Sequence, residues 1–128
     1  METNKVYKTF KDLEAWKHAR ELAGFIYRTT QLFPAYEMYG LTNQVRHSAI
    51  SVASNIAEGY GRQYKKEGIQ YLYQANGSLN EVETRLLLSN DLNFISSGML
   101  SEAIIHVECT GKLSIGYIHY LQKNDQLK

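Results

Sequence analysis

Apolar side chains recur along the chain at steps of three and four residues, which is the spacing of one face of an α-helix. The first run extends over about 12–33. Its apolar face comprises Leu13, Trp16, Ala19, Ala23, Ile26, Thr30 and Phe33. Asp12 is the expected N-cap of this helix. Pro34 predicts its end, because the residue before a proline is sterically pushed away from the helical conformation.

Three further runs show the same period. The second begins near Thr42, its expected N-cap, and ends at 59–61, and its many small side chains predict close packing against a neighbouring helix. The third extends over about 64–90, and the fourth begins at Ser97 or Ser101 and continues to near the C-terminus. The pattern therefore predicts four long helices.

Amphipathic helices of similar length that are joined by short links favour neighbours that run antiparallel. No stretch alternates apolar and polar residues for long enough to predict a sheet. We therefore predict an all-α fold, an antiparallel up-down four-helix bundle. It forms a single domain over residues 1–128, with its core at about 10–122.

Composition changes this prediction little. A hydrophobic share of 44% and a charged share of 21% are ordinary for a folded domain. The formal net charge of +1 argues against binding nucleic acid by bulk charge, although it says nothing about a local basic patch. The lone Cys109 cannot form an intrachain disulfide, residues 1–7 lack the apolar stretch of a signal peptide, and no apolar run spans a bilayer. We expect a cytoplasmic protein that does not enter a membrane.

Catalytic and metal-binding motifs are incomplete in this sequence. Di-iron bundles carry Glu-x-x-His on two helices, and none of the glutamates here has a histidine three positions later. Glu102 and His106 stand four residues apart, a spacing that is more typical of a surface hydrogen-bonded pair. Cys109 lies between apolar positions, where an unreactive cysteine is common. We therefore expect no metal, no cofactor and no enzymatic activity.

Polar side chains interrupt the apolar faces of the second and third helices. They are Ser51, Asn55 and Glu58 on the second helix and Ser78, Glu81 and Arg85 on the third. A buried polar group without a partner costs about 1–3 kcal/mol. We therefore expect these six side chains to form hydrogen bonds across the seam between the two helices and to fix its register. The alternative is that they line a ligand pocket.

A basic and aromatic segment joins the same two helices, with Tyr60, Arg62, Tyr64, Lys65 and Lys66 in close succession. Lysines at the start of a helix oppose its dipole, so helix stability does not account for them. Cations beside free helix-terminal amides favour an anion site, and tyrosines stack on unpaired RNA bases. On this hypothesis, Arg46 on the second helix extends the positive surface. The alternative is a solvated loop whose lysines keep the protein soluble.

Two strings resemble a known family. The string SVASNIAEG at 51–59, followed by Arg62, resembles the signature of bacterial four-helix-bundle proteins that are encoded in 23S ribosomal RNA intervening sequences. The string ANGSLNE at 75–81 is similar to a second element of that family. The segments FKDLEAW at 10–16 and GLTNQ at 40–44 also resemble family segments, so the resemblance covers about 7–121.

The resemblance implies a likeness to the accessory variability determinant proteins of diversity-generating retroelements, which form barrel-like homopentamers and bind nucleic acid and a reverse transcriptase. Our leading hypothesis is a homo-oligomer, a pentamer by this resemblance, that binds RNA or a nucleoprotein partner. The residues that would contact phosphates or stack on bases are Arg46, Arg62, Lys65, Lys66, Tyr60 and Tyr64. The alternative is a structural or protein–protein interaction module that does not bind nucleic acid.

Overall fold

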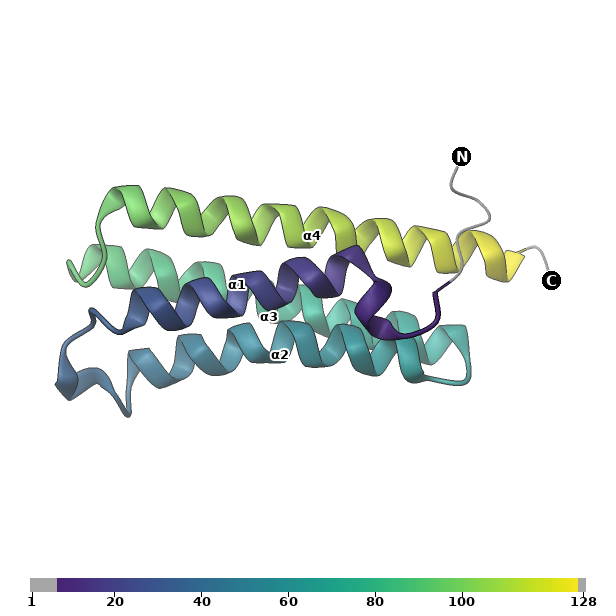
Figure 1. Cartoon of the computed structure of the whole chain (residues 1–128), viewed down its shortest axis with the longest axis horizontal. Coiled ribbons are helices and arrows are strands. Elements are labelled where there is room, and N and C mark those ends of the chain that lie inside the picture. Colours follow the sequence, from purple (N-terminus) through teal and green to yellow (C-terminus); the bar gives the residue numbers. More distant parts are fainter. Residues whose placement is uncertain (1–6, 127–128) are drawn as a thin grey trace.

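The structure, a computed structural model, describes the backbone of residues 7–126 and the side chains of residues 7–123. Within these residues the chain is all-α, as the sequence predicts. The elements are the short 3-10 helices η2 (Phe10–Asp12) and η3 (Ala35–Glu37) and the long helices α1 (Glu14–Thr30), α2 (Leu41–Gly61), α3 (Lys65–Asp91) and α4 (Ser97–Gln126). Figure 1 shows the long helices side by side in an up-down bundle, which confirms the predicted fold.

Each long helix has two neighbours in the bundle. Helix α1 packs against α2 and α4, and α3 packs against the same two helices, so the four lie at the corners of a square. The α1–α2 and α3–α4 connections lie at one end of the bundle (Figure 1). The α2–α3 turn lies at the other end, together with the N-terminal segment and the end of α4. Segments that are distant in the sequence therefore meet at each end.

The predicted N-cap of the first helix lies one residue before the observed one. Asp12 does not cap α1, whose N-cap is Leu13. Its carboxylate instead accepts hydrogen bonds from the amides of Lys8 and Thr9, at 2.8 and 3.3 Å, and so closes the 3-10 turn η2. The hydrogen bond from the Lys8 amide lowers the pKa of Asp12, because it favours the charged carboxylate.

The predicted caps of α2 and α4 also differ from the observed ones. Thr42 lies inside α2 and is buried, whereas the Glu37 carboxylate accepts the amide of Leu41 at 3.0 Å and holds the start of the helix. At the start of α4, the Ser96 hydroxyl accepts the Met99 amide at 3.1 Å. In both cases the capping oxygen comes from the residues that precede the apolar run.

The core follows the predicted apolar faces. The stripe Val45, Ala49, Val52 and Ile56 of α2 is fully buried, as expected for the helix with the smallest side chains. The largest completely buried side chains on the other helices are Leu13, Leu22, Ile26, Leu72, Val82 and Leu86. None of the helices in the described residues has the length and hydropathy that crossing a membrane requires.

Two glycines let α2 and α3 approach each other closely beside the α2–α3 turn. A Cβ atom on Gly59 would lie 2.8 Å from the carbonyl oxygen of Gly68. A Cβ atom on Gly68 would lie 2.7 Å from the carbonyl oxygen of Gly59. Both distances are shorter than a van der Waals contact and both involve backbone, so neither atom can move aside. The absence of two side chains therefore sets the spacing of these helices.

Candidate functional site

The polar side chains of α2 and α3 meet at the seam between these helices. The hydroxyl oxygens of Ser51 and Ser78 lie 3.0 Å apart and share a hydrogen bond between the helices. The Asn55 amide donates to the Ser51 carbonyl oxygen at 2.9 Å and to its hydroxyl oxygen at 3.1 Å. Asn55 therefore orients the serine that bonds to α3, rather than reaching α3 itself.

A second polar group lies toward the other end of the same seam. The Arg85 guanidinium donates to the Ser48 hydroxyl and, at 3.3 Å, to the Gln44 carbonyl oxygen. The same hydroxyl lies 3.3 Å from the Glu81 carboxylate, which also forms a 3.6 Å ion pair with Arg85. Ser48 was absent from the predicted set, although it stands one helical turn before Ser51. These mutual hydrogen bonds give the seam a register.

Glu58 does not take part in the seam, contrary to the sequence prediction. Its carboxylate forms a 2.5 Å ion pair with Arg62, one turn later on the surface of α2. The Arg62 guanidinium also donates to the Tyr71 hydroxyl at 2.6 Å and lies 4.5 Å from the centroid of that ring. Arg62 is therefore held in place by one residue from each helix, and its side chain stays 36% exposed.

The residues after Arg62 project from the start of α3. Tyr64 is 62% exposed, Lys66 is exposed and Lys65 is half-buried. Within the described residues, the structure gives neither lysine an ion pair or a hydrogen bond. Two unpaired ammonium groups and an exposed ring next to the amides of a helix start fit an anionic ligand with aromatic groups.

Tyr60 is not free to stack on a base. Its hydroxyl donates to the carbonyl oxygen of Tyr7 at 3.0 Å, and its ring packs against the core. The Tyr7 ring in turn contacts Tyr117 and Tyr120 of α4 edge-on, with centroids 6.0 and 5.9 Å away. Burial in this cluster raises the pKa of Tyr117. The four tyrosines anchor the N-terminal segment to the end of the bundle.

Arg46 also lies apart from the basic segment. Its Nε atom donates to the Thr30 hydroxyl at 2.7 Å, and its guanidinium lies 4.5 Å from the centroid of the Tyr27 ring. Sixteen residues of helix separate it from Arg62, which corresponds to about 24 Å along α2. The structure therefore separates Arg46 from the candidate site and ties it to α1.

We expect the substitution Arg46→Gln to lower the free energy of unfolding by about 1–2 kcal/mol, because it removes a charged hydrogen bond that joins α1 to α2. RNA affinity is expected to stay unchanged. Urea unfolding and RNA titration measure the two quantities, and Arg28→Gln, at an exposed arginine of α1, is the control for both. If Arg46→Gln lowered RNA affinity without lowering the free energy of unfolding, Arg46 would be an RNA-binding residue after all.

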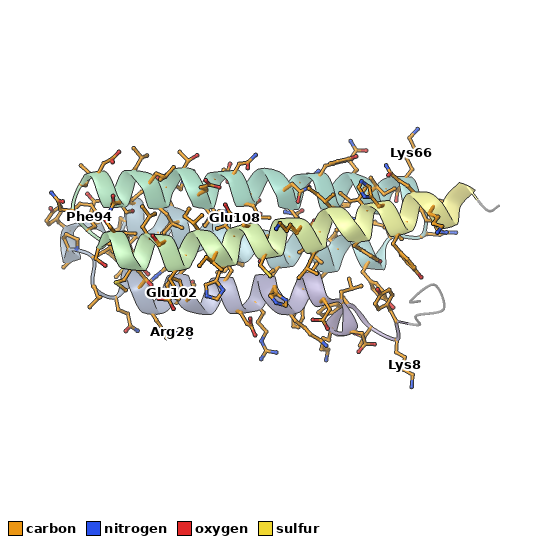
Figure 2. The ribbon with its side chains drawn as sticks, turned by 90° about the horizontal axis from the view of Figure 1, so that it is seen from above. Lys8, Arg28, Lys66, Phe94, Glu102 and Glu108 are labelled. Atoms are coloured by element: carbon orange, nitrogen blue, oxygen red, sulfur yellow. The ribbon has the colours of Figure 1, made fainter. Side chains whose placement is uncertain are left out.

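Three cations that the sequence did not single out lie at the same end of the bundle as Lys65 and Lys66. Lys8 precedes the 3-10 turn η2, Lys11 lies within it, and Lys123 lies on the last turns of α4; η2 packs against α2. In Figure 2, Lys8 and Lys66 project from the same end, while Phe94 marks the other. We call Lys8, Lys11, Arg62, Lys65, Lys66 and Lys123 the cationic end.

The opposite end of the bundle, called the cation-free end, differs in charge and in its exposed apolar side chains. The chain has no lysine or arginine at 31–45 or at 86–101, the two stretches that form this end. They carry Glu37 and Asp91 instead, with the exposed apolar side chains of Leu32, Tyr36, Met38, Tyr39, Leu88 and Leu92. The bundle is therefore polarised along its axis. Among the described residues, no cluster of three or more His, Cys, Asp or Glu side chains could hold a metal ion.

Comparison with known proteins adds a family match. A family model described as 23S rRNA-intervening sequence protein matches residues 11–116. The fold is similar to the crystal structure of a protein with unknown function from the S23 ribosomal protein family of Bacteroides thetaiotaomicron. The TM-score is 0.71 and the sequence identity 23%, over 81% of this chain and 97% of that chain. At this identity the likeness shows a shared fold. No curated protein matches the chain.

Proposed function

Because the chain belongs to the 23S rRNA-intervening sequence protein family, we propose that it is a non-enzymatic, homo-oligomeric protein of the cytoplasm that binds RNA at its cationic end. One observation carries this proposal. Lysines and arginines from three separate parts of the chain, 8–11, 62–66 and 123, gather at one end of the bundle, whereas the stretches 31–45 and 86–101 at the other end have none.

The charges at the cationic end favour a polyanion as the ligand. Asp12 is engaged by backbone amides and Glu58 by Arg62. Glu67, exposed in the first turn of α3, offsets part of the charge of Lys65 and Lys66 and leaves the end with an excess of cations. Phosphates of a nucleic acid pair with unpaired lysines and release counterions. Tyr64 adds an exposed ring on which an unpaired base can stack. This chemistry favours single-stranded or looped RNA over a regular duplex.

Self-association would increase the affinity of such a site. Each copy presents a small number of cations, and linking several copies turns later contacts into intramolecular ones. The resemblance to accessory variability determinant proteins that the sequence strings imply makes five the proposed number of subunits. Pairing of several cationic ends on one RNA would also offset the near-neutral net charge of the single chain.

RNA titration at two salt concentrations tests the proposal. For single strands, log affinity falls by about 0.7 per neutralised phosphate for each unit of log salt. Three to six contacts at the cationic end therefore predict a slope of about −2 to −4, or a roughly 15- to 250-fold loss between 50 and 200 mM salt. A labelled single-stranded RNA and a hairpin are compared by fluorescence anisotropy. Absent binding, or binding that is indifferent to salt, would exclude phosphate contacts.

A second candidate function is a protein-interaction module without nucleic-acid binding. The exposed apolar side chains at the cation-free end favour it, since a large apolar patch commonly marks an interaction surface. Tyr39 is 95% exposed and Tyr36 80% exposed. A chain that binds no RNA in the titration but retains a protein partner through these two tyrosines would fit this second function instead.

A further inference from the structure

An apolar groove runs along the outer side of α1 and α2. Its lining residues are Phe10, Trp16, Arg20, Ala23, Ile50, Ala53, Ser54 and Ala57. Alanines and Ser54 make the groove shallow, while Trp16 and the 44% exposed Ile50 form its apolar walls. Arg20 is the only charged residue that lines it, and its guanidinium lies 5.6 Å from the centroid of the Trp16 ring. The groove is thus apolar with a positive edge.

The outer face of α3 carries exposed side chains at a regular interval, and the first and last of them are apolar. Tyr71, Ser78 and Arg85 contact α2, through Arg62, Ser51 and Ser48 respectively. The residues two positions after each of these are rotated by about 200° and point away from α2. They are Tyr73, Asn80 and Leu87, all exposed and seven residues apart.

Helix α4 continues this face. A Cβ atom on Gly111 would contact Leu79, so this side of α4 faces α3. Glu108 and Ile115, three residues before and four after Gly111, lie on the same side and are exposed. Figure 2 shows Glu108 on the side of α4 that is next to α3. The α3–α4 face therefore combines apolar side chains with a carboxylate.

The charges of the two faces are complementary. The α3–α4 face carries the exposed carboxylate of Glu108, whereas Glu81 bonds toward Ser48 of α2 and Figure 2 shows Glu102 on the side of α4 that is next to α1. The groove on α1 and α2 carries Arg20 and no acidic residue. Because α1 and α2 occupy two adjacent corners of the square and α3 and α4 the other two, the groove and the α3–α4 face lie on opposite sides.

We propose that the occupant of the α1–α2 groove is the α3–α4 face of a second copy of this chain. In this contact, Leu87 and Ile115 of one copy cover the groove of the next, and Arg20 of the next copy lies near Glu108. The contact is heterologous, so every copy keeps one free groove and one free face, and the chain of copies ends only when it closes into a ring. The inference rests on the self-association proposed above and is independent of RNA binding.

The size of the two faces suits this contact. A stable interface takes about 800 Å² from each partner, which is roughly a tenth of the 7802 Å² of accessible surface on this chain. Each face extends over two of the four helices of the square. RNA is a poor occupant of the groove, because a phosphate backbone needs several cations and the groove has one.

Two double variants test the arrangement. The first, Ile50→Glu with Ser54→Glu, places acidic groups in the groove. The second, Leu87→Glu with Ile115→Glu, places carboxylates on the α3–α4 face, so the two altered surfaces repel each other. All four positions are exposed, so helix content and thermal unfolding should be retained. By light scattering, the wild type should have a mass of several chains, and each double variant should have the 14.7 kDa of one chain.

Mixing the two variants gives the decisive result. The groove variant keeps an intact α3–α4 face, and the face variant keeps an intact groove. An equimolar mixture should therefore form a 1:1 dimer of twice the single-chain mass. The control, Leu32→Lys with Tyr39→Lys at the cation-free end, should stay as large as the wild type. If the double variants remained oligomeric, or if their mixture stayed monomeric, the head-to-tail contact would be wrong, while the proposed self-association would stand. A monomeric wild type would overturn the proposed self-association as well.

Discussion

The substitution Gly68→Ala is expected to destabilise the bundle by about 2–3 kcal/mol, because it inserts a methyl group into a backbone contact that cannot open locally. The new Cβ atom would lie 2.7 Å from the carbonyl oxygen of Gly59. Helices α2 and α3 would then have to separate along the seam that holds the Ser51–Ser78 hydrogen bond. Chemical denaturation followed by circular dichroism measures the loss. Gly59→Ala should have a similar effect.

Gly77→Ala is the matched control for this prediction. Gly77 lies on the same helix, is exposed, and has no neighbouring atom within 4 Å of an added Cβ atom. The substitution should therefore raise the free energy of unfolding by up to about 1 kcal/mol, through helix propensity alone. If Gly68→Ala and Gly77→Ala changed stability equally, the close approach of α2 and α3 would not contribute to stability.

Reversing the charge of two lysines is expected to weaken RNA binding on the order of 100-fold. The slope of log affinity against log salt should also become less steep, by the amount that corresponds to about two lost phosphate contacts. The variant is Lys65→Glu with Lys66→Glu. The same change should stabilise the protein by a few tenths of a kcal/mol per site, since acidic residues at a helix start suit the helix dipole better than lysines. Anisotropy titration and denaturation measure the two effects.

The opposite signs of these effects distinguish a binding site from a fold defect. A misfolded variant would lose stability and affinity together. The charge-matched control is Arg28→Glu with Lys112→Glu, which reverses two exposed cations on α1 and α4 outside the cationic end. Equal losses of affinity in the two variants would indicate attraction by overall charge rather than a local surface.

The helices and the core could be predicted because they follow from a period that the sequence displays directly. The stripe from Val45 to Ile56 is an example, since any helix over these residues places them on one face. The helix starts could not be predicted as reliably. Thr42 has a typical capping side chain, but the fold buries it inside α2 and uses the Glu37 carboxylate at the start instead. Tertiary packing therefore decides the position of Thr42, rather than its capping propensity.

The candidate site was predicted in part, because its residues depend on contacts over long distances in the sequence. Tyr60 bonds to Tyr7, 53 residues away, and Arg46 bonds to Thr30, 16 residues away, so both take part in contacts within the fold that the sequence does not display. Lys8 and Lys123 could have been found from the up-down topology, which brings both chain ends to the α2–α3 turn. The pairing of Glu58 with Arg62 was visible as an i, i+4 spacing in the sequence.

The most direct test of the central claim is to locate bound RNA on the protein. Single-stranded RNA that carries 4-thiouridine is crosslinked to the wild-type chain by light, and the attached peptides are identified by mass spectrometry. Binding at the cationic end predicts crosslinks at Tyr64 and its neighbours and within residues 8–11, with none at the hydrogen-bonded Tyr60. Crosslinks at 31–41 or 86–101, at the cation-free end, would contradict the proposed function.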